Sequence, residues 1–324
     1  MSEPGNDGRQ PVTTTFVPPR AALDEGVSGQ ARPFEPASEW FWPVINLLGL
    51  LGVIAINAMA NILEFNGLST GDVVNRNPVY FQPAGWTFSI WSVIYALLAV
   101  FVVYTFMRAG RDDPRMRLIS PVFLVSNIAN ALWIVFWHWE QWEITLILMG
   151  VLLAALIVFY YLLRRRRGIA AQPPAMERLM VWTPFSVYIG WVSVALFANI
   201  AVWLDRTGTA IWGMDGRWTA VTMVGVLLVV TALMSLVLRD PTYAVVITWS
   251  ALGIAAEQWD RSMVVSIVAM LAVVLAAALA VLGSLLAFEQ RQRRHALPAT
   301  SRRPSEPRHL WQRKPRERHE RGRD

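Results

Sequence analysis

The chain has 324 residues, of which 55% are hydrophobic and 16% charged, and its formal net charge is +6. This composition indicates a membrane protein rather than a soluble domain. Because the chain has no cysteine, disulfides, thiolate metal sites and cysteine nucleophiles are excluded. Its 16 tryptophans are a large excess for this length.

Two polar segments flank the hydrophobic part of the chain. Residues 1–40 are rich in Pro, Gly and Ser and contain no apolar run typical of a signal peptide, and residues 289–324 are rich in Arg. We expect both to be disordered cytoplasmic tails. The basic second tail either contacts anionic lipid or only fixes the topology.

Eight apolar segments between the tails approach the ~20 residues that a helix needs to cross a bilayer. They cover about 41–62, 84–107, 119–138, 143–163, 179–204, 218–238, 242–257 and 262–288, and the seventh is the shortest. The sequence therefore predicts an all-α membrane protein with eight transmembrane helices. No Asp, Glu, Lys or Arg lies within the core of these segments, which argues against a proton- or ion-coupled transporter.

The basic residues predict an orientation. If the N-terminus is cytoplasmic and all eight segments span, 25 Lys and Arg residues lie on the inner side and 4 on the outer side. This split follows the positive-inside rule. We therefore expect a multi-pass protein of the cell membrane with both termini in the cytoplasm.

Indoles and carboxamides of three segments fall within the same outer half of the bilayer when depth is counted at about 1.5 Å per residue. They are Trp86 and Trp91 of the second segment, Asn130 and Trp133 of the third, and Trp191 and Asn199 of the fifth. Other tryptophans fit a belt at the headgroups, namely Trp137, Trp139, Trp142, Trp203, Trp212, Trp218 and Trp259. Three amides of the first segment, Asn46, Asn57 and Asn61, favour hydrogen bonds between helices.

A connection of about 20 residues joins the first two segments, long enough to form a lid. Pro83 suits the first turn of the following helix. Gly85 would let another backbone or a flat ligand approach closely. We therefore expect the start of the second segment to form a pocket wall under a lid.

Three motifs point to a family. They are Pro83-Ala84-Gly85-Trp86-Thr87-Phe88 followed by Trp91 and Tyr95, Asn130-Ala131-Leu132-Trp133 with Phe136, and the run from Tyr188 to Ala195 that ends at Asn199. Together they resemble the TspO/MBR family, the tryptophan-rich sensory proteins related to the mitochondrial translocator protein (peripheral benzodiazepine receptor). The resemblance covers about residues 41–204 and implies a TspO-like five-helix domain there. The three predicted helices over 205–288 lie outside it, as a transmembrane extension. Ala84, Ser126 and Val187 depart from the family's pattern.

The resemblance also implies a ligand, a porphyrin or other tetrapyrrole held in an outer-leaflet pocket by a sensor or carrier. The expected ligand-binding residues are Trp86, Phe88, Trp91, Tyr95, Asn130, Trp133, Tyr188, Trp191, Ala195 and Asn199. Indoles would stack on the ligand and amides and hydroxyls would hydrogen-bond to it. We expect no required cofactor, with porphyrin or haem as a ligand. The expected partners are a tetrapyrrole-type small molecule and membrane lipid but no nucleic acid, and a homodimer stays open.

Other functions stay open. The resemblance also allows an enzyme for light-dependent porphyrin breakdown, in which Trp radicals would act. General acid–base chemistry is disfavoured, because the membrane segments offer no paired carboxylates or nucleophile. A small-molecule transporter is disfavoured because five plus three helices do not form equal repeats. A structural protein with a Trp-rich core is the third alternative. His138 could ligate a haem iron, but a lone histidine at a membrane interface is more often solvated.

Overall fold

The computed structural model describes residues 36–165 and 173–296, and those from Glu39 onward belong to one compact unit. Most of the two predicted tails lies outside these ranges. The long helices are α1 (Pro36–Ile62), α3 (Ile90–Phe106), α5 (Pro114–His138), α6 (Trp142–Arg165), α8 (Thr183–Thr207), α9 (Gly216–Ala232), α10 (Pro241–Gln258) and α11 (Met263–Ala296). Every predicted apolar segment therefore corresponds to a helix, and within the described ranges no strand occurs.

Within the described ranges, seven helical segments are long and apolar enough to cross a membrane, by length and composition. The exception is α10, an 18-residue helix that corresponds to the shortest predicted segment. The fifth span is longer than expected because α7 (Ala175–Glu177) and a π-helical turn, η4 (Arg178–Trp182), run directly into α8. A second π-helical turn, η6 (Leu233–Val237), extends α9. The last helix, α11, continues past the expected end of its span at residue 288.

Acidic residues set the starts of three helices. The carboxylates of Asp113, Asp215 and Asp240 accept backbone N–H groups in the first turns of α5, α9 and α10. Proline follows at the first position of α5 and α10, where a helix needs no N–H donor. The C-terminal end of α8 is set by Gly208, which adopts a left-handed φ of 63° and stops the helix.

The connection between α1 and α3 is not the simple loop that the sequence suggested. It contains a short helix, α2 (Thr70–Arg76), between two 3-10 turns, η2 (Phe65–Gly67) and η3 (Gly85–Ser89). A capping box starts α2, because the Ser69 side chain accepts the Asp72 N–H and the Asp72 carboxylate accepts the Ser69 N–H. The connection is therefore an ordered element over the bundle.

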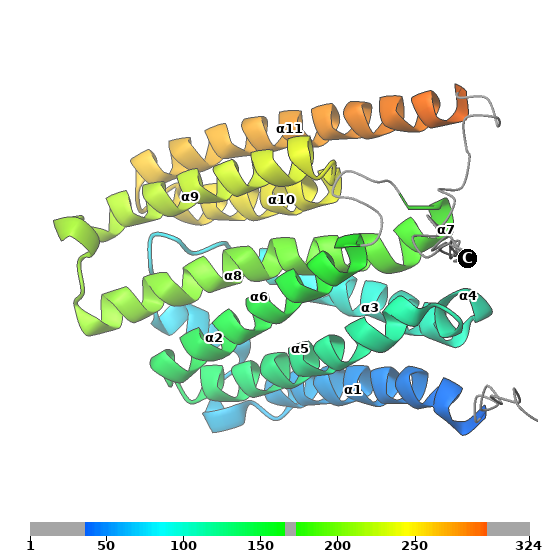
Figure 1. Ribbon diagram of the computed structural model, residues 1–324. Coiled ribbons are helices and arrows are strands. Elements are labelled where there is room, and N and C mark those ends of the chain that lie inside the picture. The colour runs from blue at the N-terminus through cyan, green and yellow to red at the C-terminus, as the bar shows by residue number, and fades with distance from the viewer. Residues whose placement is uncertain (1–35, 166–172, 297–324) are drawn as a thin grey trace, which may run out of the picture. The chain divides into compact units, whose positions relative to one another are not determined.

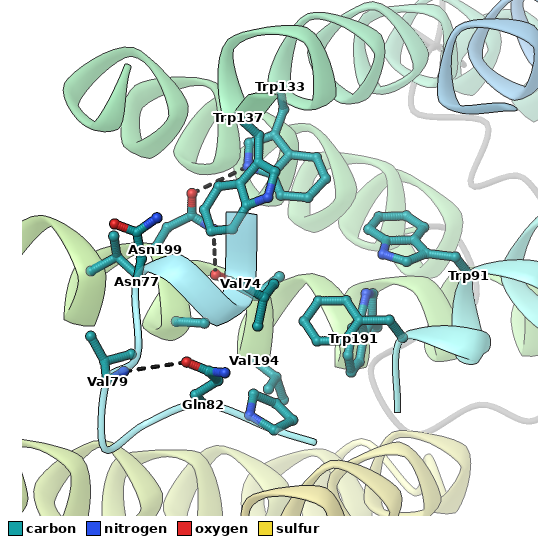
Figure 2. Close-up of a pocket in the computed structure, with 15 residues that line it drawn as sticks. Val74, Asn77, Val79, Gln82, Trp91, Trp133, Trp137, Trp191, Val194 and Asn199 are labelled. Atoms are coloured by element: carbon teal, nitrogen blue, oxygen red, sulfur yellow. Dashed lines mark hydrogen bonds between the residues drawn. The ribbon is translucent and has the colours of Figure 1, made fainter. Parts of the chain in front are cut away.

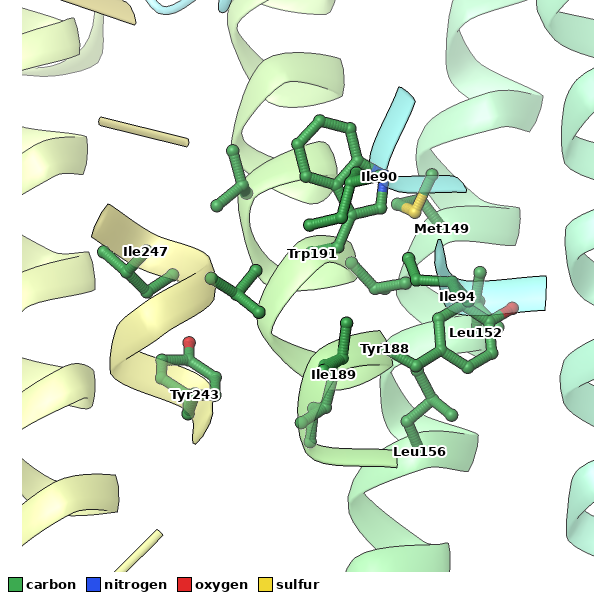
Figure 3. Close-up of a cluster of buried hydrophobic side chains, with 14 of the residues drawn as sticks. Ile90, Ile94, Met149, Leu152, Leu156, Tyr188, Ile189, Trp191, Tyr243 and Ile247 are labelled. Carbon is green, nitrogen blue, oxygen red and sulfur yellow. The ribbon is translucent and has the colours of Figure 1, made fainter. Parts of the chain in front are cut away.

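Helix α8 occupies the middle of the described bundle and contacts α3 and α6 on one side and α9 and α10 on the other (Figure 1). Its buried side chains meet apolar residues of three neighbours (Figure 3). Ile94 of α3, Leu152 of α6 and Ile247 of α10 are all almost fully buried in this cluster. The five-helix region and the three-helix extension therefore share one hydrophobic core.

Polar side chains join α1 to α5. The Asn46 side-chain amide donates to the Ser120 hydroxyl (2.9 Å), and the Asn57 side-chain amide donates to Oδ1 of the Asn130 side chain (3.3 Å). The predicted interhelical roles of these two asparagines are confirmed. Asn61 instead accepts the backbone N–H of Thr70 at the start of α2.

Candidate ligand-binding site

A pocket lies between the connection that carries α2, the start of α3, and the facing sides of α5 and α8 (Figure 2). Its walls are Val74, Asn77, Val79, Gln82, Pro83, Phe88, Trp91, Trp133, Trp137, Trp191, Val194, Ala195, Ala198, Asn199 and Val202. Because Val74 and Asn77 come from α2 and its C-terminal end, this helix forms one side of the pocket. Every other side is contributed by a membrane-spanning helix or by the segment that leads into α3.

Four indoles dominate the pocket. Trp91 and Trp133 are stacked, with ring centroids 6.1 Å apart and planes inclined by 28°, and Trp137 lies 5.5 Å beyond Trp133. Trp191 meets Trp91 edge-on at 6.3 Å, and Phe88 meets Trp191 edge-on at 5.6 Å. These separations suit attractive ring contacts. The pocket therefore presents both ring faces and ring edges to whatever enters it.

The polar groups of the pocket are few and unequally satisfied. Trp133 donates its Nε1–H to Asn199 Oδ1 (3.2 Å), while the Asn199 amide donates to Ala195 O (2.8 Å). In contrast, the buried Nε1 atoms of Trp137 and Trp191 have no hydrogen-bond partner among the described residues. None of the described side chains that line the pocket is charged. The pocket thus suits a neutral, flat body that carries hydrogen-bond acceptors.

The pocket is narrow because its own rings fill most of it. Its cavity volume is only about 40 Å³. A second hollow, with about 320 Å³ on the same measure, lies beside it among α1, α3 and α5. Phe88 and Trp91 line both hollows. These two side chains therefore form a wall that the two spaces share.

Nine of the ten residues expected from the sequence fall into three places. Six line the pocket, namely Phe88, Trp91, Trp133, Trp191, Ala195 and Asn199. Tyr95 lines the second hollow. Asn130 and Tyr188 are buried outside the pocket lining, where the Asn130 amide donates to the Tyr188 hydroxyl (2.8 Å).

Trp86 does not join the others. Its side chain is half-exposed and packs edge-on against Trp249 of α10, with ring centroids 4.7 Å apart. Trp137, assigned from sequence to the interfacial belt, lies in the pocket instead. Its spacing of four residues from Trp133 puts both on one helix face, and that signal could have revealed it. Gln82 and Pro83 also line the pocket.

His138 is not solvated, contrary to the expectation for an interfacial histidine. It is fully buried, with Nδ1 2.8 Å from Ile134 O and Nε2 3.5 Å from the Thr70 hydroxyl. The ring lies outside the pocket lining and fixes the start of α2 against α5. Its environment is therefore that of a structural residue.

Helix α10 holds the segment that enters α3. Ala84 N–H donates to Gly253 O (3.0 Å), Trp249 Nε1 donates to Thr87 O (3.1 Å), and the Gln258 amide donates to Val79 O (3.3 Å). The close approach expected at Gly85 occurs at Gly253 instead. A Cβ on Gly85 would meet nothing within 4 Å, whereas one on Gly253 would lie 2.4 Å from Thr87 Cγ2.

The carboxylate of Asp72 stabilises the start of α2 through the capping box. The hydrogen bonds from the Ser69 side chain and backbone lower the pKa of Asp72 below its ordinary value. The folded state therefore favours the ionised form, which completes the capping box at neutral pH. This charge lies at the start of the helix whose other end lines the pocket.

These features define the class of protein as an all-α, multi-pass membrane protein with an indole-lined pocket among its helices. Comparison with known families then gives a specific result, because the family model described as TSPO-like protein matches residues 43–282. The chain belongs to this family. The match continues through α9 and α10 into α11, which corrects the expectation that the resemblance ends near residue 204. No curated protein and no solved structure matches the chain.

Proposed function

We propose that this protein is a membrane sensor or carrier whose pocket binds a flat, hydrophobic molecule of the tetrapyrrole type. Family membership supports a role of the sensor or carrier kind. The observation that carries the ligand class is the set of four indoles from α3, α5 and α8 around one space, with the N–H groups of Trp137 and Trp191 unpaired among the described residues. Ring faces attract a planar ligand, and the unpaired donors favour one with acceptor atoms.

The narrowness of the pocket specifies how such a ligand would enter. A cavity volume of about 40 Å³ is too small for a macrocycle, since pockets for drug-sized ligands are on the order of 300–1,000 Å³. Joining the two hollows by movement of Phe88 and Trp91 gives the missing room. Binding is then coupled to a change at the start of α3.

The charged groups at the rim indicate how an acidic tetrapyrrole would be oriented. Arg206 is exposed beyond α2, where it donates to the side chain of Asn77, a pocket residue, and to Arg76 O. Carboxylate side chains of the ligand would lie towards this guanidinium, since the pocket itself offers no described cation. The Arg206→Gln variant should bind protoporphyrin more weakly but bind its dimethyl ester unchanged.

A titration tests the pocket directly. Protoporphyrin is added to the purified protein in detergent, and binding is followed by the porphyrin absorbance and by quenching of Trp fluorescence. Each of Trp91→Phe, Trp133→Phe and Trp191→Phe should weaken binding by about three- to tenfold. Trp218→Phe, an exposed indole on α9, is the control. Unchanged affinity in all three pocket variants would reject the proposal.

Light-dependent breakdown of the bound ligand is the second candidate, favoured by one observation. The indoles of Trp91, Trp133, Trp137 and Trp142 follow one another with centroid separations of 5.3–6.1 Å. Such a row suits the movement of a radical between rings. Illumination of the porphyrin complex in air should produce a bilin-like absorbance if this activity exists, and an unchanged spectrum would leave only binding.

The distribution of basic residues supports a location of both termini in the cytoplasm. The cysteine-free chain makes this orientation easy to test. A membrane-impermeant maleimide should label Thr209→Cys in intact cells but label Asp112→Cys only after permeabilisation. The reverse pattern would invert the topology.

A further inference from the structure

A second pocket lies near the N-terminal end of α8, away from the indoles. Its walls come from the end of α6, from η4, from the turn between η6 and α10, and from α11. Three guanidinium groups line it, those of Arg164, Arg178 and Arg239. Its cavity volume is about 70 Å³. We refer to it as the arginine pocket.

Arg164 forms the fixed part of this pocket. Its side chain is buried, with Nη1 donating to Leu238 O (2.9 Å) and Nη2 donating to the Tyr160 hydroxyl (2.5 Å). The guanidinium carbon also lies 4.5 Å from the Tyr160 ring centroid and 4.6 Å from that of Trp182. A cation held in this way is positioned before any ligand arrives.

Asp240, the one carboxylate among the described residues that line the pocket, already accepts three hydrogen bonds. Asp240 accepts hydrogen bonds from the Tyr160 hydroxyl (2.6 Å), from the Ser186 hydroxyl and from Thr242 N (3.2 Å). It therefore ties α6 to α8 and caps α10. Three positive charges face one negative charge, so the described lining carries an excess of two positive charges.

The other two arginines are placed to meet a ligand. Arg178 is half-buried and forms no salt bridge with any described residue. Arg239 lies on the same wall, donates to Leu286 O (2.9 Å) among other contacts, and has a left-handed backbone φ of 53°. This conformation ends the helical segment before α10, where Asp240 N–H donates to Met234 O (2.9 Å), and Arg239 lines the pocket at this turn.

We propose that the arginine pocket binds a phosphate-bearing anion. Guanidinium groups match phosphate oxygens with paired N–H donors, and the Thr183 and Thr242 hydroxyls that line the pocket add neutral donors. The pocket lies at the ends of membrane-spanning helices, where a basic cleft suits the headgroup of an anionic phospholipid. Free phosphate shares the same chemistry, and the test distinguishes the two sources.

The test uses the full chain, delipidated in a neutral detergent. Thermal unfolding and native mass spectrometry are measured with phosphatidylglycerol, with phosphatidylcholine and with inorganic phosphate. We expect phosphatidylglycerol to bind and raise the unfolding temperature, and phosphatidylcholine to do neither. Stabilisation by inorganic phosphate at low millimolar concentration would assign the pocket to a soluble anion instead. Failure of both anions to bind would overturn the proposal.

Charge-removing variants locate the binding. Arg178→Gln and Arg239→Gln should each weaken anion binding about tenfold. Arg217→Gln, which removes an exposed charge at the start of α9, should leave binding unchanged. Arg164 is left intact because it also holds α6 and the turn before α10. Wild-type affinity in both pocket variants, with normal helicity, would show that the anion binds elsewhere.

Discussion

The region from α1 to α8 contains recognisable sequence motifs for a binding site, and the region from α9 to α11 does not. The first carries the tryptophan and asparagine motifs and contributes every residue that lines the indole pocket. The second has no such motif and lines none of it. Yet α10 supplies three hydrogen bonds to the segment from Val79 to Thr87, which forms part of the pocket wall. A region without recognisable chemistry can therefore fix the geometry of a site built elsewhere.

The largest effect should come from filling the notch at Gly253. In Gly253→Ala the new Cβ would lie 2.4 Å from Thr87 Cγ2, so the wall segment or α10 has to move. We expect a loss of about 3 kcal/mol of stability, as for an overpacked core, and weaker porphyrin binding. Thermal unfolding and the absorbance titration measure the two effects. Gly225→Ala on α9 is the control, because its Cβ would meet nothing within 4 Å. Equal behaviour of the two variants would show that α10 does not hold the wall.

A change inside the first region should act on the pocket directly. Asn199→Ala removes the acceptor of the Trp133 indole N–H and leaves that donor buried, at a cost of about 2 kcal/mol. Porphyrin affinity should change as well, because the Trp133 ring is then free to turn. In a Trp133→Phe background the stability penalty of Asn199→Ala should largely disappear. Asn75→Ala, an exposed amide on α2, should have no effect in either measurement.

A milder change in the second region sharpens the comparison. Trp249→Phe keeps an aromatic ring beside Trp86 but removes the hydrogen bond to Thr87 O, and we expect a loss of about 1 kcal/mol. If α10 positions the wall, porphyrin affinity should fall although Trp249 lies outside the pocket. The exposed Trp259 provides the matched substitution, Trp259→Phe. If only Trp259→Phe lost porphyrin affinity, the loss would come from contacts of that exposed ring with lipid headgroups and not from the pocket wall.

The smallest effect concerns pH and the capping box of α2. The pKa of Asp72 is lowered in the folded state, so the stabilisation by its carboxylate is present at neutral pH. It is lost as the pH falls below about 4, the ordinary range of aspartate, and through the folded pKa. We expect porphyrin binding to weaken slightly over this window in the wild type. In Asp72→Asn binding should be slightly weaker already at pH 7 and should change less between pH 5 and 3 than in the wild type, because only the ligand's own carboxylates still titrate in this window. Identical profiles would separate α2 from ligand binding.

Much of the fold could be predicted from the sequence because membrane-spanning helices depend on long apolar runs. Every such run became a helix, and the shortest run gave the helix that is least suited to span a membrane. Helix α2 was missed although Ser69 and Asp72 have the spacing of a capping box. The length of the connection between α1 and α3 suggested a loop, whereas the capping-box spacing of Ser69 and Asp72 within it indicates a helix start.

The candidate site could be predicted only as far as helix depth determines it. Trp91, Trp133, Trp191 and Asn199 were expected together because residues in the same half of the bilayer on neighbouring helices can meet. Depth does not determine which way a ring points, so Trp86 was expected beside them but contacts Trp249. The bonds from α10 join residues more than 160 positions apart, and no spacing rule relates such positions.

The contact between Thr87 and Gly253 also constrains how these sequences can diverge. While position 87 keeps a threonine, any side chain at position 253 collides with it. Position 253 can therefore gain a side chain only if residue 87 becomes smaller. Shrinking Thr87 to alanine removes its two nearest atoms, leaving its Cβ 3.1 Å from a new Cβ at position 253, which a small shift accommodates. The two positions should therefore covary among homologues, and the double substitution Thr87→Ala with Gly253→Ala should recover part of the stability that the single Gly253 change removes.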